Sequence, residues 1–233
     1  MARADPRDVL VLKAGRPPCE MKDLPAGAVV GTSSIRRTAQ VALKYPHLRV
    51  RDVRGNVPTR LQKLDADDSP FDAVIIAAAG LIRLDLAHRI SQYLDSISGG
   101  MLYAVGQGAI GVEMRADDQN MNRILSKIED KSVTLACSAE RSLLGTLEGG
   151  CSAPLGVETK WLQPELLQMN AIVVSVNGSE SVQSEMQAQV QTLAEADQFG
   201  KSVAADLLRK GADRILAAIQ AKKLTRPADL EQT

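Results

Sequence analysis

The sequence has few aromatic residues, few cysteines, no excess of either charge and no long apolar run. Aromatic residues make up 3% of its 233 residues, so the core must be built from aliphatic side chains. The 28 basic and 28 acidic residues cancel, which argues against a general nucleic-acid or membrane-surface binder. No apolar run approaches the ~20 residues of a membrane span, and the first residues lack the apolar segment of a signal peptide. We therefore predict a soluble, cytoplasmic protein.

Cysteine and histidine are too scarce to build a disulfide framework or a histidine-rich metal site. The three cysteines are Cys19, Cys137 and Cys151, an odd count that fits a reducing compartment. The only histidines are His47 and His88, and we predict no metal. A GxGxxG spacing occurs at residues 106–111, but the residues after it resemble a strand rather than a helix, so nucleotide binding is disfavoured.

The charge that is present is unevenly distributed. The segment between Gly31 and Arg60 contains seven basic residues and one acidic residue, Asp52, which gives a local net charge of +6. Between Asn177 and Phe199 there are four acidic residues and no basic one. An anion-binding region is therefore expected near the first of these segments.

Strands and helices are predicted to alternate over the first hundred residues. Strands are expected to end at residues 29–30 and to span 50–53 and 73–78; the helices that follow them carry Ile35, Ala39 and Leu43, then Leu61 and Leu64 after an Asn56 cap, then Leu81, Leu84 and Ile90. This alternation indicates a parallel sheet covered by helices. Such a sheet binds ligands at the carboxyl ends of its strands.

The pattern changes after Gly99-Gly100. Residues 104–116 look strand-like, and helices are predicted at about 118–128 and from a Ser132 cap to Gly149. Antiparallel strands are predicted at 154–161, 166–176 and 181–190, the last two joined by a turn at Asn177-Gly178, and two helices separated by Gly211 follow. The fold class is therefore α/β, with a periplasmic-binding-protein-like parallel-sheet domain followed by a small α+β domain containing a three-stranded antiparallel sheet.

Arginines recur where the predicted strands give way to helices. Arg36 and Arg37 lie in the first turn of a helix, where the helix dipole disfavours cations. A bound anion would offset this cost and accept hydrogen bonds from Ser33 or Ser34; the alternative is a pair of solvated surface arginines. Arg54 and Arg60 repeat the arrangement at the next strand end. Because guanidinium groups bind both oxygens of a carboxylate, the pattern favours a polycarboxylate ligand.

Cys151 follows two glycines at the end of a predicted helix. The alternative to a functional thiol is a small buried apolar residue. The helix C-terminus would raise the pKa of the thiol, so we expect no strongly activated thiolate. Such a thiol suits the capture of a highly reactive electrophile.

Several stretches together resemble one family, porphobilinogen deaminase (hydroxymethylbilane synthase), in the family's order. They are residues 30–37 (VGTSSIRR), 54–57 (RGNV) with 59–61 (TRL), 79–84 (AGLIRL), 103–109 (YAVGQGA) and 147–151 (LEGGC). The resemblance implies head-to-tail condensation of four porphobilinogen molecules to hydroxymethylbilane, with release of ammonia, in haem biosynthesis. It implies that Cys151 holds a dipyrromethane cofactor through a thioether. It also implies that cofactor and substrate carboxylates are bound by Thr32, Ser33, Ser34, Arg36, Arg37, Arg54, Gly55, Arg60 and Arg83.

The resemblance further implies a chain lacking most of the family's first domain. Residues 1–20 would be a remnant and crossover, 21–103 the α/β substrate-binding domain, 104–130 a segment of the missing domain, and 131–233 the C-terminal domain. No acidic residue can be matched to the family's catalytic aspartate. The resemblance implies that full-length members of the family are monomers. In this chain, however, four apolar residues should lack packing partners, which predicts aggregation or fast amide exchange over residues 104–128. They are Val105, Ile110, Val112 and Ile124.

Three alternatives remain open. The chain could be a catalytically incomplete fragment that binds tetrapyrrole polycarboxylates, which ammonia release would distinguish. It could be an unrelated anion-binding protein with a periplasmic-binding-type sheet, in which Cys151 is dispensable. Nucleic-acid binding through the basic stretch is disfavoured by the zero net charge and the few stacking aromatics.

Overall fold

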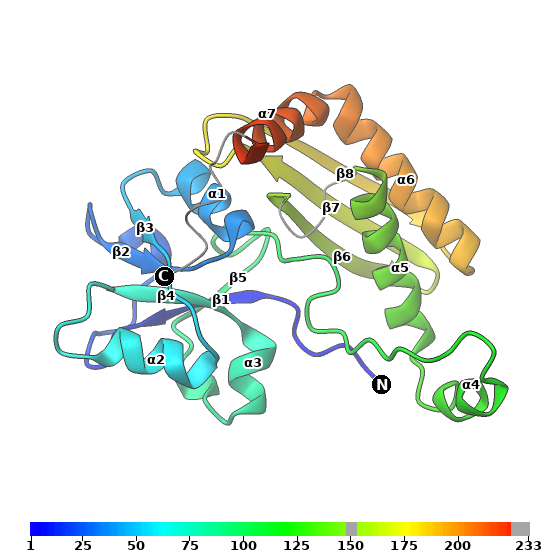
Figure 1. The fold of residues 1–233 in the computed structure, drawn as a ribbon, viewed down its shortest axis with the longest axis horizontal. Helices are drawn as coiled ribbons and strands as arrows, with labels where there is room; N and C mark the ends of the chain where they lie inside the picture. Colours follow the sequence, from blue (N-terminus) through cyan, green and yellow to red (C-terminus); the bar gives the residue numbers. More distant parts are fainter. Residues whose placement is uncertain (148–152, 225–233) are drawn as a thin grey trace.

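The computed structural model describes residues 1–147 and 153–224, without the side chains of 222–224. Two sheets, each with its own helices, lie side by side (Figure 1). The first half contains β1 (Asp8–Leu12), η1 (Met21–Asp23), β2 (Val29–Gly31), α1 (Ile35–Lys44), β3 (Arg49–Arg51), α2 (Val57–Asp65), β4 (Ala73–Ala77), α3 (Ala78–Arg83), η2 (Ala87–Arg89) and β5 (Gln92–Leu94). The second half contains α4 (Gln119–Leu125), α5 (Lys131–Thr146), β6 (Leu155–Gln163), β7 (Leu166–Val174), β8 (Ser181–Gln189), α6 (Leu193–Arg209) and α7 (Ala212–Leu224).

The first sheet is mixed rather than wholly parallel, in the strand order β3-β2-β4-β1-β5. β2 pairs in parallel with β3 and β4, as predicted. β1, however, runs antiparallel to both β4 and β5, with Asp8 opposite Ala77 and Leu12 opposite Ala73. The strand at residues 8–12 was not predicted from the sequence, and its presence makes the sheet mixed; because β1 is buried on both faces, its apolar run carries no information on strand direction.

Helices cover both faces of this sheet. On one face Leu10 and Ile75 pack with Val41 and Tyr45 of the α1 region. On the other face the alternate residues of β1 and β4 pack against α2 and α3, through Leu61, Leu64 and Leu81. The ends of β2, β3 and β4 are thereby held at one edge, where the polar loops emerge.

The second sheet is antiparallel in the order β6-β7-β8, as predicted. Alternate residues of β7 face the core formed with α5, α6 and α7. Ile172 and Val174 face the other way and pack with Ala39 of α1, which joins the two halves. The predicted turn contains Gly178 with φ +72°, and Gly211, with φ +100°, separates α6 from α7.

Three predictions about element boundaries were wrong. Residues 104–116 form no strand; only Tyr103 makes an isolated bridge, to Val157. The cap of α5 is Asp130 rather than Ser132, because the Asp130 carboxylate accepts from the backbone N–H of Ser132. The third helix ends at Arg83, which leaves Leu84 exposed and Ile90 outside it.

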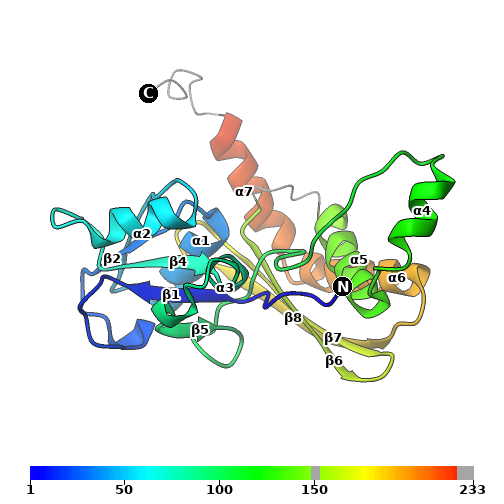
Figure 2. The same ribbon diagram turned by 90° about the horizontal axis from the view of Figure 1, so that it is seen from below.

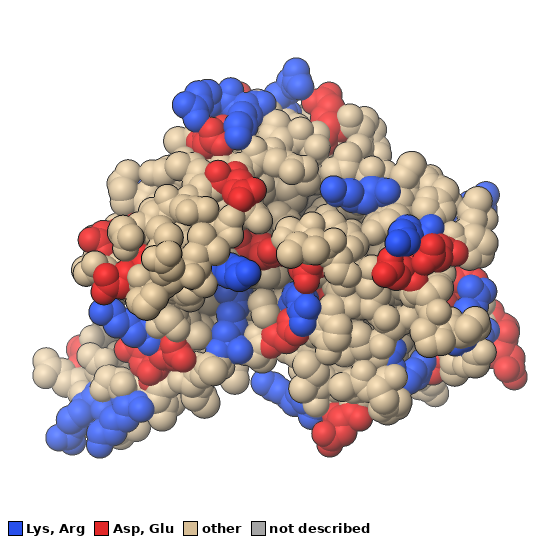
Figure 3. Space-filling model, turned by 180° about the vertical axis from the view of Figure 1, so that it is seen from behind, with Lys and Arg blue, Asp and Glu red and all other residues tan. Residues whose placement is uncertain are grey.

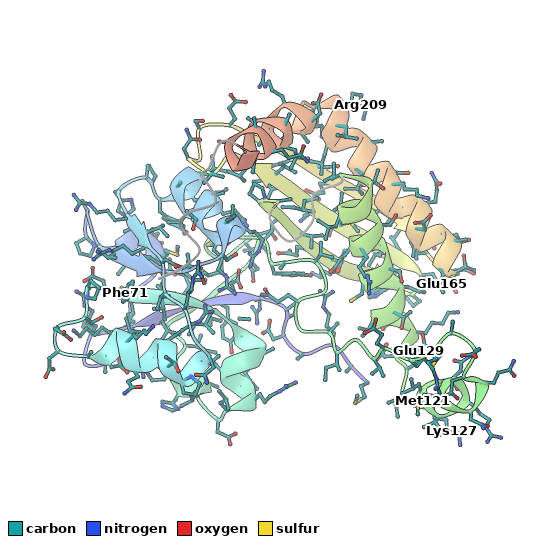
Figure 4. The ribbon with its side chains drawn as sticks, in the orientation of Figure 1. Phe71, Met121, Lys127, Glu129, Glu165 and Arg209 are labelled. Atoms are coloured by element: carbon teal, nitrogen blue, oxygen red, sulfur yellow. The ribbon has the colours of Figure 1, made fainter. Side chains whose placement is uncertain are left out.

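Residues 110–128 form an arm that extends away from both sheets (Figure 2). The arm ends in α4, whose side chains, including Met121, and the following Lys127 and Glu129 lie at the periphery (Figure 4). Most of its large apolar side chains are exposed, and Leu125 is half-buried; the exposed ones are Ile110, Val112, Met114, Met121, Ile124 and Ile128. Val105, by contrast, packs against the second core, contrary to the prediction that it lacks a partner.

Within residues 1–147 and 153–224, no helix is long and apolar enough to cross a membrane. The same part of the chain contains no cluster of three or more histidine, cysteine or acidic side chains suited to a metal ion. Acidic and basic side chains alternate over the face shown in Figure 3 rather than forming a region of one sign.

Candidate functional site

The loops after β2 and β3 are tied together at the edge of the first sheet. The N–H of Thr32 donates to the carbonyl of Arg51 at 3.0 Å, and the Ser33 hydroxyl donates to the carbonyl of Val53 at 3.2 Å. Ser34 caps α1, because its hydroxyl accepts from the N–H of Arg37. The sequence-predicted serine and threonine residues therefore shape the loop from which the arginines project.

Arg36 and Arg37 share one buried carboxylate, that of Asp8 on β1. Arg36 Nη1 lies 2.7 Å from Asp8 Oδ2, and Arg37 Nη2 lies 2.7 Å from Asp8 Oδ1. Each guanidinium also donates to a backbone carbonyl, that of Leu102 for Arg36 and that of Ile75 for Arg37. Asp8 is fully buried, and the two arginines are 6% and 8% exposed.

This triad overturns the alternative that the two arginines are solvated surface residues, because both are buried. An internal carboxylate, that of Asp8, already offsets part of the cost of placing them at a helix N-terminus. Burial acts to raise the pKa of Asp8, but Arg36 and Arg37 outweigh it, so the pKa lies well below its usual range. The available sequence signal was an acidic residue at the start of the otherwise apolar run at residues 8–12.

One donor of the pair has no partner within the structure. The Nε of Arg37 is buried and makes no hydrogen bond to any described residue. Nearby, Arg60 donates to the carbonyl of Gly55 at 2.7 Å. Burial lowers the pKa of Arg60, and the Arg37 charge lowers it further. An added acceptor with negative charge would satisfy the Arg37 donor and relieve the repulsion between the two guanidiniums.

The remaining predicted residues lie around this pair. Arg54 is exposed and pairs with Asp52 at 2.9 Å. Gly55 has φ +122°, and a Cβ there would lie 2.8 Å from Thr59, so the turn requires glycine. Arg83, at the end of α3, is exposed. The side chains available to an incoming ligand are thus cationic and differ in burial.

The loop at residues 103–108, between β5 and α4, also reaches the arginines. Gln107 donates to Asp8 Oδ1 at 2.9 Å and to the carbonyl of Pro6 at 2.7 Å. The loop is anchored by Glu140 of α5, which accepts from the N–H of Gly106 and pairs with Arg3. Sequence reasoning did not assign these residues to the site, because their contacts span about a hundred residues of chain.

Comparisons with known proteins match both halves of the chain. Residues 1–123 match the family described as porphobilinogen deaminase, dipyromethane cofactor binding domain, and residues 134–209 match the porphobilinogen deaminase C-terminal domain. The chain belongs to the porphobilinogen deaminase family.

Porphobilinogen deaminases of several fungi are similar along most of the chain. That of Yarrowia lipolytica is 52% identical over 224 residues, which cover 96% of this chain and 65% of the relative. That of Candida albicans is 49% identical over 93% of this chain and 63% of the relative. That of Saccharomyces cerevisiae is 45% identical over 95% of this chain and 68% of the relative. The chain thus spans about two thirds of the length of these porphobilinogen deaminases.

The match to the cofactor-binding domain of porphobilinogen deaminase includes every predicted arginine, from Arg36 to Arg83, and also Asp8 and Gln107. Cys151, the predicted attachment residue, lies outside the described residues. The other two cysteines, Cys19 and Cys137, are free and partly buried. Burial raises the pKa of the Cys137 thiol, and the charge of Glu140 raises it further, which makes Cys137 a poor nucleophile.

Proposed function

We propose that this chain takes part in the condensation of porphobilinogen to hydroxymethylbilane, with release of ammonia. Family membership makes this the leading function. The observation that carries it here is the group of arginines at the strand ends, among which a buried Arg37 Nε lacks an acceptor. Porphobilinogen carries an acetate and a propionate, so a growing chain of pyrroles presents several carboxylates to such a group.

The same residues fit the dipyrromethane cofactor. Arg37 and Arg60 would bind its carboxylates from the buried side, and Arg54 and Arg83 from the exposed side, while Thr32, Ser33, Ser34 and Gly55 hold the loops in place. Cys151 would form the thioether. When bound, the dipyrromethane supplies the pyrrole end from which the product chain is extended; this chain's own residues bind and orient its carboxylates.

The test is the intact mass of the purified protein before and after incubation with hydroxymethylbilane, followed by peptide mapping. A dipyrromethane adduct at Cys151 is expected; Cys151→Ser should lose it and Cys137→Ser, the matched thiol control, should keep it. Ammonia release on addition of porphobilinogen then tests turnover. A folded protein that remains unmodified and releases no ammonia would contradict the proposal.

We also propose that residues 104–130 serve as a docking segment for the part of the porphobilinogen deaminase fold that this chain does not cover. The apolar side chains at 110, 112 and 114 alternate as in a strand, yet they are 64%, 57% and 38% exposed. In the division of the chain that the resemblance implies, residues 1–20 form the remnant and crossover, 21–103 the substrate-binding domain and 131–233 the cofactor-bearing domain. Without the rest of the fold to cover these apolar side chains, we expect the protein to aggregate, whereas the complete fold would be monomeric.

Two further properties follow as proposals. The order β3-β2-β4-β1-β5, with a single antiparallel strand between parallel ones, supports a periplasmic-binding-protein-like domain. The free thiols of Cys19 and Cys137 support a reducing, cytoplasmic location.

A further inference from the structure

The Gln107 side chain, on the loop at residues 103–108, contacts both the acid and an arginine of the triad formed by Asp8, Arg36 and Arg37. Its Nε2 donates to Asp8 Oδ1 at 2.9 Å and to the carbonyl of Pro6 at 2.7 Å. Its Oε1 lies 3.5 Å from Arg36 Nη2, at the limit of a hydrogen bond. Both ends of the amide are therefore used, which fixes its orientation.

The backbone around Gln107 is fixed as well. Arg3 donates to the Gln107 carbonyl at 2.9 Å, and Glu140 accepts from the N–H of Gly106 at 2.7 Å. Gly108 has φ +81°, and a Cβ there would lie 2.5 Å from the carbonyl oxygen of Ala4. Because the loop cannot shift without breaking these contacts, Gln107 presents its amide to Asp8 from a fixed position.

Asp8 Oδ1 receives hydrogen bonds from two sides. Arg37 Nη2 donates to it at 2.7 Å, and Gln107 Nε2 donates at 2.9 Å. The other carboxylate oxygen, Asp8 Oδ2, accepts a hydrogen bond from Arg36 Nη1 at 2.7 Å. Arg37 Nη1 is held separately by the carbonyl of Ile75 at 2.8 Å, so loss of the amide would leave the contact between Arg37 Nη2 and Asp8 Oδ1 as the part of the network that can adjust. The Ile75 carbonyl and the Gln107 amide, acting through Asp8, thus together set the orientation of the Arg37 guanidinium and of its unpartnered Nε.

We propose that Gln107 is a positioning residue of the polycarboxylate site. Acting through Asp8, it aims the Arg37 Nε–H at the ligand carboxylate, and its Oε1 holds Arg36. This inference rests on the proposed function for its ligand, but the orientation of the arginines can be measured without any ligand.

The experiment compares Gln107→Leu with Gln62→Leu, which makes the same change at an exposed glutamine of α2. In the ligand-free protein, the arginine Nε–H signals of Arg36 and Arg37 in nitrogen–proton spectra should shift in Gln107→Leu and stay in place in Gln62→Leu. Affinity for porphobilinogen, measured by titration calorimetry, should fall about tenfold in Gln107→Leu, as for loss of a hydrogen bond to a charged group. Unmoved arginine signals, or moved signals with unchanged affinity, would overturn the proposal.

Gln107→Glu adds a readout that a purely structural role would not move. The introduced carboxyl would face Asp8 on β1 and Arg36 and Arg37 on α1. The charged groups that hold its loop are Arg3, near the N-terminus, and Glu140 on α5. When ionised it repels Asp8, but when protonated it is again a donor to Asp8 Oδ1. The affinity ratio of wild type to Gln107→Glu should therefore shrink as the pH falls. A ratio that does not change with pH would contradict the positioning role.

The two proposals fail in different ways. A folded wild-type protein that does not bind porphobilinogen contradicts the proposed function. In that case the arginine signals still decide whether Gln107 sets the geometry of Arg36 and Arg37.

Discussion

Replacing Asp8 by asparagine should destabilise the protein far more than the same change at an exposed ion pair. Asp8 is fully buried and lies 2.7 Å from both Arg36 and Arg37. The isosteric amide removes the charge and leaves two buried guanidiniums without their counterion. Removing one partner from a buried pair costs about 3–5 kcal/mol, which is a large part of the ~5–15 kcal/mol that holds a typical protein folded.

The matched control is Asp52→Asn, which removes the partner of Arg54 at a site where the two side chains are 54% and 83% exposed. Exposed pairs contribute about 1 kcal/mol or less, so this variant should unfold close to the wild type. The free energy of unfolding is measured with urea and followed by far-UV circular dichroism; urea is chosen because guanidinium is a salt and screens charges. Equal midpoints for the two variants would refute the argument that the Asp8 triad is a buried, stabilising network.

The pH dependence of the same comparison tests the direction of the Asp8 pKa. The pKa of this carboxyl is held below its unfolded value of about 3.9, because Arg36 and Arg37 outweigh the effect of burial. The stability contributed by its charge is therefore present above about pH 4 and is lost as the pH falls through the folded value. The difference in unfolding free energy between wild type and Asp8→Asn should be constant from pH 5 to 8 and shrink below pH 4.

Three further predictions concern the rest of the fold. Gly200→Ala should lower the free energy of unfolding by several kcal/mol, because the added Cβ would lie 2.2 Å from the carbonyl oxygen of Ala139. Gly145→Ala, at a helical position with open space around it, should instead raise the free energy of unfolding by about 0.5–1 kcal/mol. Thermal melts that give the two variants the same melting temperature would contradict this. Burial raises the pKa of Tyr103 to about 12, so part of the stability should be lost as the pH rises above 10, and Tyr103→Phe should remove that part of the alkaline loss in urea titrations. Amide exchange followed by mass spectrometry should be fast over residues 110–128 and slow in β1 and β4, and slow exchange of the arm in a soluble monomer would refute its lack of packing partners.

Local sequence signals predicted the elements that depend on short-range physics. The Asn56 cap, the turn at Gly178 and the three antiparallel strands are all confirmed. The strand β1 was not predicted, and its direction could not be, because a strand buried on both faces has no pattern that reveals its neighbours. The strand expected at 104–116 was also wrong; its alternating apolar residues have no sheet to join within the described part of the chain.

The arginine site shows the same limit more sharply. Sequence reasoning located Arg36 and Arg37 and inferred an anion, because a cation pair at a helix N-terminus is unfavourable on its own. It could not locate Asp8, since the pairing exists only when β1 inserts beside β4.

The first eight residues and the loop at 103–108 therefore link the arginine pair to the second core. Ala4 donates to the carbonyl of Gly108, and Val157 of β6 donates to the carbonyl of Tyr103. Glu140 of α5 pairs with Arg3 and accepts from the N–H of Gly106, the residue directly before Gln107, which contacts Asp8. Because Glu140 lies on α5, a displacement of this helix would be transmitted to the arginines through Gly106 and Gln107. The geometry of Arg36 and Arg37 is thus set jointly by the first sheet and by contacts that reach α5 in the second core.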